Sequence, residues 1–181
     1  SAASEENDAP NPISIYGQNK LSSENYFSIL LPNIPVINFR MFNVYGPGQC
    51  LDDLNQGMVS IYIAMAINNE EIEIKGSLDR IRDFIYIDDV ILFWYKAIKH
   101  EFHSHEKINL GTGKATSVNS LIEFIKKNSS SNITIKVSES TPCDQTFIYS
   151  NNNKLIELFG DFQFIKLEKG IKLFIDYSKG Y

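Results

Sequence analysis

The stretch VINFRMFNVYGPGQ (residues 36–49) decides the fold class of this chain. Its first half, VINFRMF (36–42), follows Pro35 and is rich in branched and aromatic residues, which predicts a buried strand. Its second half, NVYGPGQ (43–49), predicts a Gly/Pro turn at the carboxyl end of that strand. In open α/β sheets, ligands bind at these strand ends, so the turn is a first candidate for a binding region.

Helices are predicted on both sides of this stretch. Upstream, residues 15–31 form a helical segment that follows Pro12 and Ser14 and is closed by Pro32. Downstream, MVSIYIAMAI (58–67) is apolar on several faces, which predicts a buried helix. The strand therefore lies between two helices.

The same alternation continues to the end of the chain. We expect Asp88 to cap a helix at 90–100 and Ser117 to cap a helix at 118–128, because short polar side chains accept hydrogen bonds from the free N–H groups of a helix. Further strands are predicted at 71–76, 83–87, 107–113 and 133–137, and further helices at 153–159 and 167–177. Strands that alternate with helices predict an α/β protein with a largely parallel sheet.

The composition argues against several classes of protein. The 181 residues include 22 acidic and 17 basic side chains, and this net charge of −5 argues against a general binder of nucleic acids or anionic membranes. No apolar run approaches the roughly eighteen residues of a membrane span. Cys50 and Cys143 fit a reducing compartment, and the polar start SAASEENDAP (1–10) does not resemble a signal peptide. We expect a cytoplasmic globular protein.

A tyrosine and a lysine are spaced to act together on the first predicted helix. In YGQNK (16–20), Tyr16 and Lys20 stand four residues apart, which places both on one helix face. A phenol with an ordinary pKa of about 10 is a poor base at neutral pH, but a neighbouring cation stabilises the phenolate. Such a pair can act as general acid and base toward a hydroxyl or carbonyl group. The spacing by itself more often marks an amphipathic surface helix.

Three further motifs follow YGQNK in order, namely RMFNVYGPGQ (40–49), RDFIYIDDV (82–90) and INLGTG (108–113). With these four motifs the chain resembles the extended short-chain dehydrogenase/reductase family, specifically its nucleotide-sugar epimerases and dehydratases. The resemblance implies a partial Rossmann-type parallel sheet and a smaller α/β substrate-binding region. The dinucleotide-binding part would comprise residues 1–45 and 80–112, and the substrate-binding region would comprise 46–79 and 113–181.

The resemblance implies catalytic roles near the amino terminus. Tyr16 looks like the family's catalytic tyrosine, which exchanges a proton with the sugar hydroxyl that is oxidised. Lys20 looks like its partner, which stabilises the phenolate and hydrogen-bonds the nicotinamide ribose. Ser1 is the candidate for the family's catalytic serine or threonine, with Ser4 as the alternative.

The resemblance also implies binding roles for three residues further along the chain. Phe42 stands where the family contacts the cofactor, and Asn43 stands where it touches the diphosphate of the nucleotide sugar. Arg82 matches the arginine that grips this diphosphate, and guanidinium groups pair well with phosphate oxygens. The alternative for Arg82 is a surface salt bridge with Asp79 or Asp83.

The chain also departs from the family's pattern. The glycine fingerprint G-x-x-G-x-x-G and the acidic residue that reads the cofactor ribose are absent. An initiator Met is absent too, so we expect the later part of a longer protein, which alone binds NAD weakly or not at all. In TPCDQTFIYSNNNK (141–154), Cys143 precedes Asp144 and the family's arginine is missing. One phosphate or ribose contact is therefore missing or supplied from elsewhere.

The activity implied by the resemblance is epimerisation. NAD, or alternatively NADP, would oxidise the C4 hydroxyl of a UDP- or dTDP-hexose to a ketone, which is then reduced on the opposite face. A 4,6-dehydratase stays open because two glutamates follow Ser4, although two alanines follow Ser1. A keto-sugar reductase and a non-catalytic binding module derived from the family also stay open. The resemblance further implies that the protein forms a homodimer and binds a nucleotide sugar as its substrate. It implies binding to neither nucleic acid nor a membrane.

Three other features have structural explanations. The spacing of His100, His103 and His105 could bind a metal, but they stand at a predicted helix end without further ligands and fit a solvated terminus better. The resemblance implies no metal. The aromatic run at 93–95 is expected to pack in the core, and the turn at 109–113 is expected to be structural.

Overall fold

The computed structural model describes residues 2–53, 57–129, 133–140 and 144–180. The helices are α1 (Ile15–Leu30), α2 (Met58–Ile67), α3 (Ile87–Lys99), α4 (Val118–Asn128), α5 (Asn153–Phe159) and α6 (Leu167–Lys179). The strands are β1 (Ile37–Met41), β2 (Asn43–Tyr45), β3 (Ile72–Lys75), β4 (Ile81–Arg82), β5 (Phe84–Tyr86), β6 (Glu106–Leu110), β7 (Thr116–Ser117), β8 (Ile135–Ser138) and β9 (Phe147–Ile148). In this described part of the chain, no helix combines the length and apolar character needed to cross a membrane.

Most strand pairs are parallel, as predicted. β1 pairs with β6 in a register that runs from Ile37 opposite Glu106 to Met41 opposite Leu110. The pairs β2–β5, β3–β8 and β4–β9 are also parallel, whereas β4–β7 is antiparallel. Each parallel pair joins strands with at least one helix between them in sequence, as parallel crossovers require. The predicted α/β class with a largely parallel sheet is confirmed.

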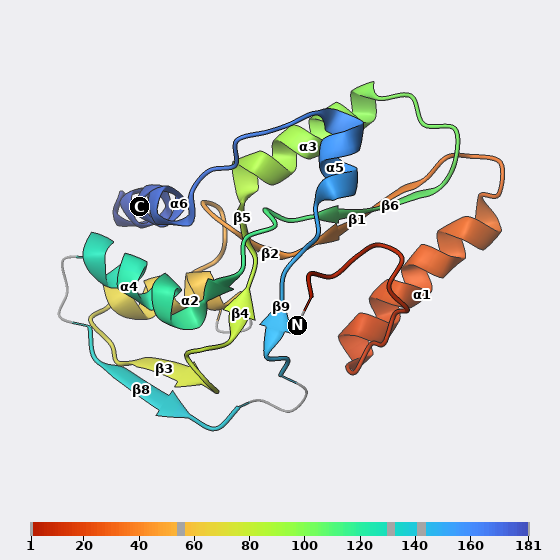
Figure 1. Cartoon of the computed structure of the whole chain (residues 1–181). Coiled ribbons are helices and arrows are strands. Elements are labelled where there is room, and N and C mark those ends of the chain that lie inside the picture. Colours follow the sequence, from red (N-terminus) through yellow and green to blue (C-terminus); the bar gives the residue numbers. More distant parts are fainter. Residues whose placement is uncertain (1, 54–56, 130–132, 141–143, 181) are drawn as a thin grey trace.

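Two groups of helices cover these strands (Figure 1). In one group, α2, α4 and α6 pack against one another and α2 lies against β3, with Ile63 and Ile122 fully buried in the shared core. In the other, α3 and α5 cover β1 and β6, and Phe93 and Ile108 lie in the shared core. Each such side chain contributes about 1.5–3 kcal/mol by burial, so these two clusters hold most of the fold together.

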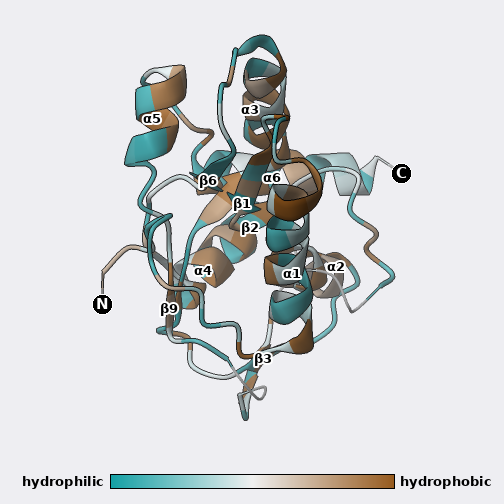
Figure 2. Ribbon diagram, turned by 90° about the vertical axis from the view of Figure 1, so that its right-hand side faces the viewer, coloured by the Kyte–Doolittle hydropathy of each residue, from teal (hydrophilic) through white to brown (hydrophobic). Residues whose placement is uncertain are grey.

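Helix α1 stands apart from both clusters (Figure 1). None of its residues is buried, and Ile15 is 83% exposed. Figure 2 views this helix from outside and shows hydrophobic and hydrophilic segments alternating along it. A bidentate ion pair joins it to β1: Arg40 donates from Nε to Glu24 Oε1 at 2.9 Å and from Nη2 to Oε2 at 2.8 Å.

One of the two predicted helix caps is confirmed. Ser117 caps α4, because its hydroxyl accepts a hydrogen bond from the backbone N–H of Ser120 at 3.1 Å. The prediction for Asp88 is wrong, since α3 begins at Ile87, directly after β5, and Tyr86 occupies the cap position. Asp88 and Asp89 instead lie in the first turn, where carboxylates interact favourably with the helix dipole.

The aromatic run on α3 is only partly in the core. Phe93 is 1% exposed, but Trp94 is 51% and Tyr95 is 59% exposed, so the prediction was wrong for the last two. Successive residues of a helix point about 100° apart, and three in a row therefore cannot all face one core.

Two element boundaries also differ from the prediction. The turn expected at 43–49 begins only at Gly46, because Asn43–Tyr45 forms β2 and pairs with β5. The strand expected at 133–137 lies at Ile135–Ser138, in register with β3. In both places the pairing partner, rather than the local sequence, sets where the strand starts and ends.

Candidate functional site

The structure brings Tyr16 and Lys20 together at the start of α1. The helix begins there because the Ser14 hydroxyl caps it, accepting a hydrogen bond from the Gly17 N–H at 3.1 Å. The Lys20 ammonium then lies 5.2 Å from the centroid of the Tyr16 ring. Tyr16 is 73% exposed, so its hydroxyl is accessible to a ligand. The expectation that the two side chains share a helix face is confirmed.

These two residues line an open cleft of about 550 Å³. Phe42, which follows β1, lines the same cleft, as does Trp94 on α3. The Trp94 ring packs against Phe39 of β1, with the ring centroids 6.1 Å apart. Three residues predicted from sequence to serve catalysis or cofactor binding, from α1 and the end of β1, therefore face one space.

A second cleft of about 410 Å³ lies against the same stretch of β1. Both clefts are lined by Arg40, Met41 and Phe42, so they meet at the end of the strand. Asn43 lines the second cleft, and its side-chain amide donates to the Asp83 carbonyl oxygen at 2.9 Å. The Asn43 backbone N–H donates to the same oxygen at 3.0 Å, which fixes the direction of the side chain.

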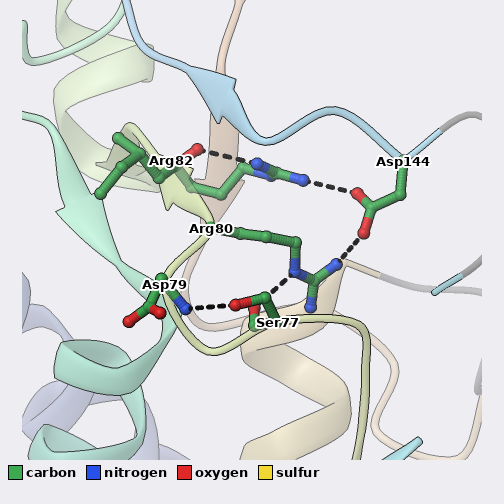
Figure 3. A network of polar contacts seen from close by, with 6 residues as sticks. Ser77, Asp79, Arg80, Arg82 and Asp144 are labelled. Atoms are coloured by element: carbon green, nitrogen blue, oxygen red, sulfur yellow. Dashed lines mark hydrogen bonds and ion pairs between the residues drawn. The ribbon is translucent and has the colours of Figure 1, made fainter. Parts of the chain in front are cut away.

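Arg82 is buried and pairs with neither of the partners named from sequence. It is 4% exposed, and its Nη2 donates to Asp144 Oδ1 at 2.7 Å while Nη1 donates to the Ile81 carbonyl oxygen at 2.8 Å. The alternative of a surface salt bridge with Asp79 or Asp83 is therefore wrong (Figure 3). Asp79 lies exposed on the preceding turn, and adjacent residues of a strand point to opposite faces, which directs the side chain of Asp83 away from Arg82.

Arg80 shares the same carboxylate, and sequence analysis missed this residue. It donates from Nη1 to Asp144 Oδ2 and from Nε to the Ser77 carbonyl oxygen at 2.9 Å (Figure 3). A signal was present, because residues two apart in an extended segment lie on one face, and Arg80 and Arg82 have this spacing. The shared partner was not visible, since Asp144 comes 62 residues after Arg82. Neither arginine lines the two clefts described above.

The serine candidates are placed differently. Ser1 lies outside the described residues. Ser4, the alternative, lines the second cleft. Glu6, one of the two glutamates that kept the dehydratase open, accepts a hydrogen bond from the Asn109 backbone N–H at 2.8 Å. This carboxylate therefore ties the amino-terminal segment to β6.

The histidines lie at the end of α3 and in the loop that follows. His100 and His103 are exposed, and the His100 ring lies 4.4 Å from the Phe102 ring. Within residues 2–53, 57–129, 133–140 and 144–180, no group of three or more His, Cys, Asp or Glu side chains could hold a metal ion. His100 contributes to aromatic packing at the helix end.

Comparison with known proteins agrees with this arrangement. Residues 1–111 match the model of the NAD dependent epimerase/dehydratase family, and the match includes α1, β1 and Arg82. The chain belongs to this family. It is 32% identical over 123 residues to the dTDP-4-dehydro-6-deoxyglucose reductase of Escherichia coli, covering 67% of this chain and 38% of that relative.

Two solved structures show the same fold as this epimerase/dehydratase family member. The UDP-glucose 4-epimerase of Thermotoga maritima, solved with UDP-glucose, is 29% identical with a TM-score of 0.89, over 97% of this chain and 56% of that one. A variant of the UDP-glucuronic acid 4-epimerase of Bacillus cereus, solved with NAD and a fluorinated UDP-sugar, is 28% identical with a TM-score of 0.90, over 99% and 57%. The Rossmann-like fold is therefore confirmed, and this chain spans little more than half of these structures.

In this family member, Asp83 connects the site to the carboxyl-terminal part of the chain. Its carboxylate is fully buried and accepts hydrogen bonds from Thr112 N–H at 3.0 Å, Thr112 Oγ1 at 2.5 Å, Gly113 N–H at 3.0 Å and Ser150 Oγ at 2.6 Å. Its carbonyl oxygen meanwhile holds Asn43. The turn that carries Thr112 and Gly113 thus has a structural role, as expected.

Proposed function

We propose that this chain carries the catalytic pair and the substrate-binding part of an NAD-dependent nucleotide-sugar 4-epimerase. The observation that carries the proposal is that Tyr16 and Lys20 share one cleft with Phe42 at the carboxyl end of β1. Family membership and the likeness to two UDP-sugar 4-epimerase structures support it. In this reaction a sugar C4 hydroxyl is oxidised to a ketone and then reduced on the opposite face.

Tyr16 and Lys20 would move the proton. The Tyr16 hydroxyl takes the proton of the sugar hydroxyl as the ketone forms and returns it on reduction. The Lys20 ammonium lies 5.2 Å from the ring centroid and stabilises the phenolate that the tyrosine needs as a base. NAD, or alternatively NADP, supplies the hydride chemistry when bound. Ser1 or Ser4 would orient the sugar hydroxyl.

The residues present fit one end of the cofactor. A hydroxyl, an ammonium and an aromatic ring, from Tyr16, Lys20 and Phe42, face one cleft, and these groups suit a nicotinamide and its ribose. The 181 residues contain no G-x-x-G-x-x-G loop for the cofactor pyrophosphate. The structures compared are longer than this chain. We therefore place the phosphate-binding loop in a further segment of the complete enzyme.

The substrate would be held by its diphosphate. Asn43 is oriented by two hydrogen bonds to the Asp83 carbonyl oxygen, and Arg82 supplies a guanidinium group. A guanidinium group presents several donors in a plane and pairs with phosphate oxygens in a bidentate manner. The sugar then lies between this anchor and Tyr16, with residues 46–79 and 113–181 forming the substrate-binding region.

A keto-sugar reductase is the second candidate, because the Escherichia coli relative carries that activity in its name. The product distinguishes the two reactions: an epimerase interconverts UDP-glucose and UDP-galactose without net consumption of cofactor, whereas a reductase consumes one reduced cofactor for each turnover. A 4,6-dehydratase is less favoured, since the carboxylate of Glu6 is engaged by the Asn109 backbone.

The test is a set of substitutions in the complete enzyme, assayed with UDP- and dTDP-hexoses. Tyr16→Phe keeps the ring but removes the exchangeable proton, so kcat should fall by about 10²–10⁴-fold while nucleotide-sugar binding survives. Arg82→Ala should chiefly raise KM. Tyr26→Phe alters an exposed tyrosine on the same helix and should leave both constants unchanged. A Tyr16→Phe enzyme with near-normal kcat would refute the assignment.

We also propose that the enzyme is a cytoplasmic homodimer. Helix α1 presents Ile15, Tyr26, Ile29 and Leu30 to solvent, at 83%, 62%, 72% and 71% exposure, and a second α1 would cover such a surface. Sedimentation equilibrium of the complete enzyme tests this, and Ile29→Glu with Leu30→Glu should shift it toward monomer. If the unmodified enzyme sediments with the mass of a single subunit, the dimer is refuted.

A further inference from the structure

Two arginines share one carboxylate in the interior of this protein. Arg82 binds Asp144 Oδ1 at 2.7 Å, and Arg80 binds Asp144 Oδ2 (Figure 3). The side chains of Arg80, Arg82 and Asp144 are only 9%, 5% and 11% exposed. Among the described residues, the ion pairs of both arginines end on this single carboxylate, so the cluster carries one excess positive charge.

The neighbouring groups do not cancel this charge. The carboxylate of Asp79 points away from both guanidinium groups in Figure 3. Burial raises the pKa of the Tyr62 phenol, so this neighbouring group is neutral near pH 7. Burial lowers the pKa of Arg82, Asp144 raises it, and the charge of Arg80 lowers it again. A buried cation without its own counter-ion is costly, and an anionic ligand would relieve that cost.

Both guanidinium groups keep donors for such a ligand. Each carries five N–H donors. Arg80 uses donors on the Ser77 carbonyl oxygen and on Asp144. Arg82 uses donors on Asp144 and on the Ile81 carbonyl oxygen. The remaining donors on the two side chains can converge on one polyanion, because both groups are anchored to the same carboxylate.

The turn before β4 is shaped to let Asp144 approach Arg80. Gly76 has φ of +87°, and a Cβ at this position would lie 3.1 Å from Asp144 Oδ2 and 3.4 Å from Arg80 Cζ. Such contacts are tighter than side chains normally make, so a residue with a side chain at 76 would push against the ion pair. The backbone thus accommodates the three-membered cluster at the place where Asp144 and Arg80 meet.

We propose that Arg80 and Arg82 together bind the diphosphate of the nucleotide sugar, with Asp144 as the positioning residue that holds the two guanidinium groups side by side. This inference rests on the proposed function, which assigns Arg82 alone. A diphosphate brings two negative charges and several acceptor oxygens, and therefore uses two guanidinium groups where a single charge would use one. Arg80 is thus a second substrate ligand.

The first experiment is made on the unmodified chain, whose sequence contains three arginines, Arg40, Arg80 and Arg82, and uses a variant only to assign a signal. Their three Nε–H signals are followed by ¹⁵N NMR of the 181-residue chain during titration with inorganic pyrophosphate and then UDP-glucose. The Arg80 signal is identified by its loss in Arg80→Lys. We expect the Arg80 and Arg82 signals to shift together with one dissociation constant. A shift of Arg82 alone, or of neither, would overturn the proposal.

The second experiment measures affinity by calorimetry. Arg80→Gln should weaken the binding of pyrophosphate and UDP-glucose about tenfold or more, and Arg80→Lys should recover part of that loss. Lys126→Gln, the same charge change on the exposed face of α4, should have no effect. Equal UDP-glucose affinity in Arg80→Gln and the unmodified chain would overturn the role of Arg80 and leave the nucleotide-sugar function standing. If the chain binds pyrophosphate through Arg80 but has no affinity for UDP-glucose, the anion site is supported and the nucleotide-sugar function is refuted.

Discussion

At the scale of the residue, Asp83 is the carboxylate on which the geometry of the site depends. Its oxygens accept hydrogen bonds from Thr112, Gly113 and Ser150, and its backbone holds Asn43. Asp83→Ala would leave the buried Ser150 hydroxyl and the part-buried N–H and hydroxyl of Thr112 without this acceptor, at about 1–3 kcal/mol for each donor that stays out of water. We expect the free energy of unfolding to fall by about 3 kcal/mol or more in urea denaturation. Ser150→Ala, which removes a single donor, should cost about 1 kcal/mol, and an equal loss in both variants would contradict this network.

Lys20 has a matched control on another helix. In the complete enzyme, Lys20→Met should lower kcat, because the negative charge that develops on the Tyr16 oxygen during proton transfer loses a neighbouring cation. Lys99 lies in the same way over the Tyr95 ring, 5.6 Å from its centroid, but on α3 and outside both clefts. Lys99→Met should therefore leave kcat unchanged. If Lys20→Met does not lower kcat, Lys20 has no part in the proton transfer.

At the scale of the element, α1 is attached to its neighbours β1 and β6 by ion pairs of Glu24 with Arg40 and Lys107. It buries none of its own residues, and Arg40 links it to β1 through Glu24. The hydrogen bond from Arg40 holds the pKa of the Glu24 carboxyl below its ordinary value of 4.5, with burial acting in the opposite direction. The pKa is thus lower in the folded state, so this stabilisation is present above about pH 4.5 and is lost as the pH falls through the folded value.

We therefore expect α1 to loosen before the rest of the molecule. At pH 7, Glu24→Gln should increase hydrogen exchange in peptides from 15–30 while the peptides of α4 stay protected. In the unmodified chain, the same increase should appear below about pH 4.5 after correction for intrinsic exchange rates. Glu123→Gln is the control. The Glu123 side chain is 60% exposed and that of its ion-pair partner Lys126 is 37% exposed, so this pair contributes little to stability. Unchanged exchange in Glu24→Gln would show that other contacts hold the helix.

At the scale of the whole molecule, the two proposed ligands divide between this chain and the rest of the enzyme. The 181 residues hold the proposed contacts for the sugar nucleotide but no glycine-rich loop for the cofactor pyrophosphate. We expect this chain alone to bind NAD weakly or not at all and to retain measurable affinity for UDP-glucose. Calorimetry with each ligand is the measurement. Micromolar binding of NAD by this chain would contradict the division.

The sequence alone was sufficient for the features that depend on neighbours along the chain. The shared face of Tyr16 and Lys20, the cap at Ser117 and the alternation of strands with helices follow from helical and extended periodicity, which acts over a few residues. The order of the four motifs was also enough to indicate the family. The match of residues 1–111 to the family model confirms it.

Only the tertiary structure decided which distant groups meet. Arg82 takes its partner from a segment 62 residues later, and Asp83 takes a donor from Ser150, 67 residues later. It likewise decided that Phe93 is buried while Trp94 is exposed, because that depends on what packs against α3. The physical reason is that such contacts form only when chain closure brings remote segments together. The spacing of residues along the sequence carries no record of which remote segment that will be.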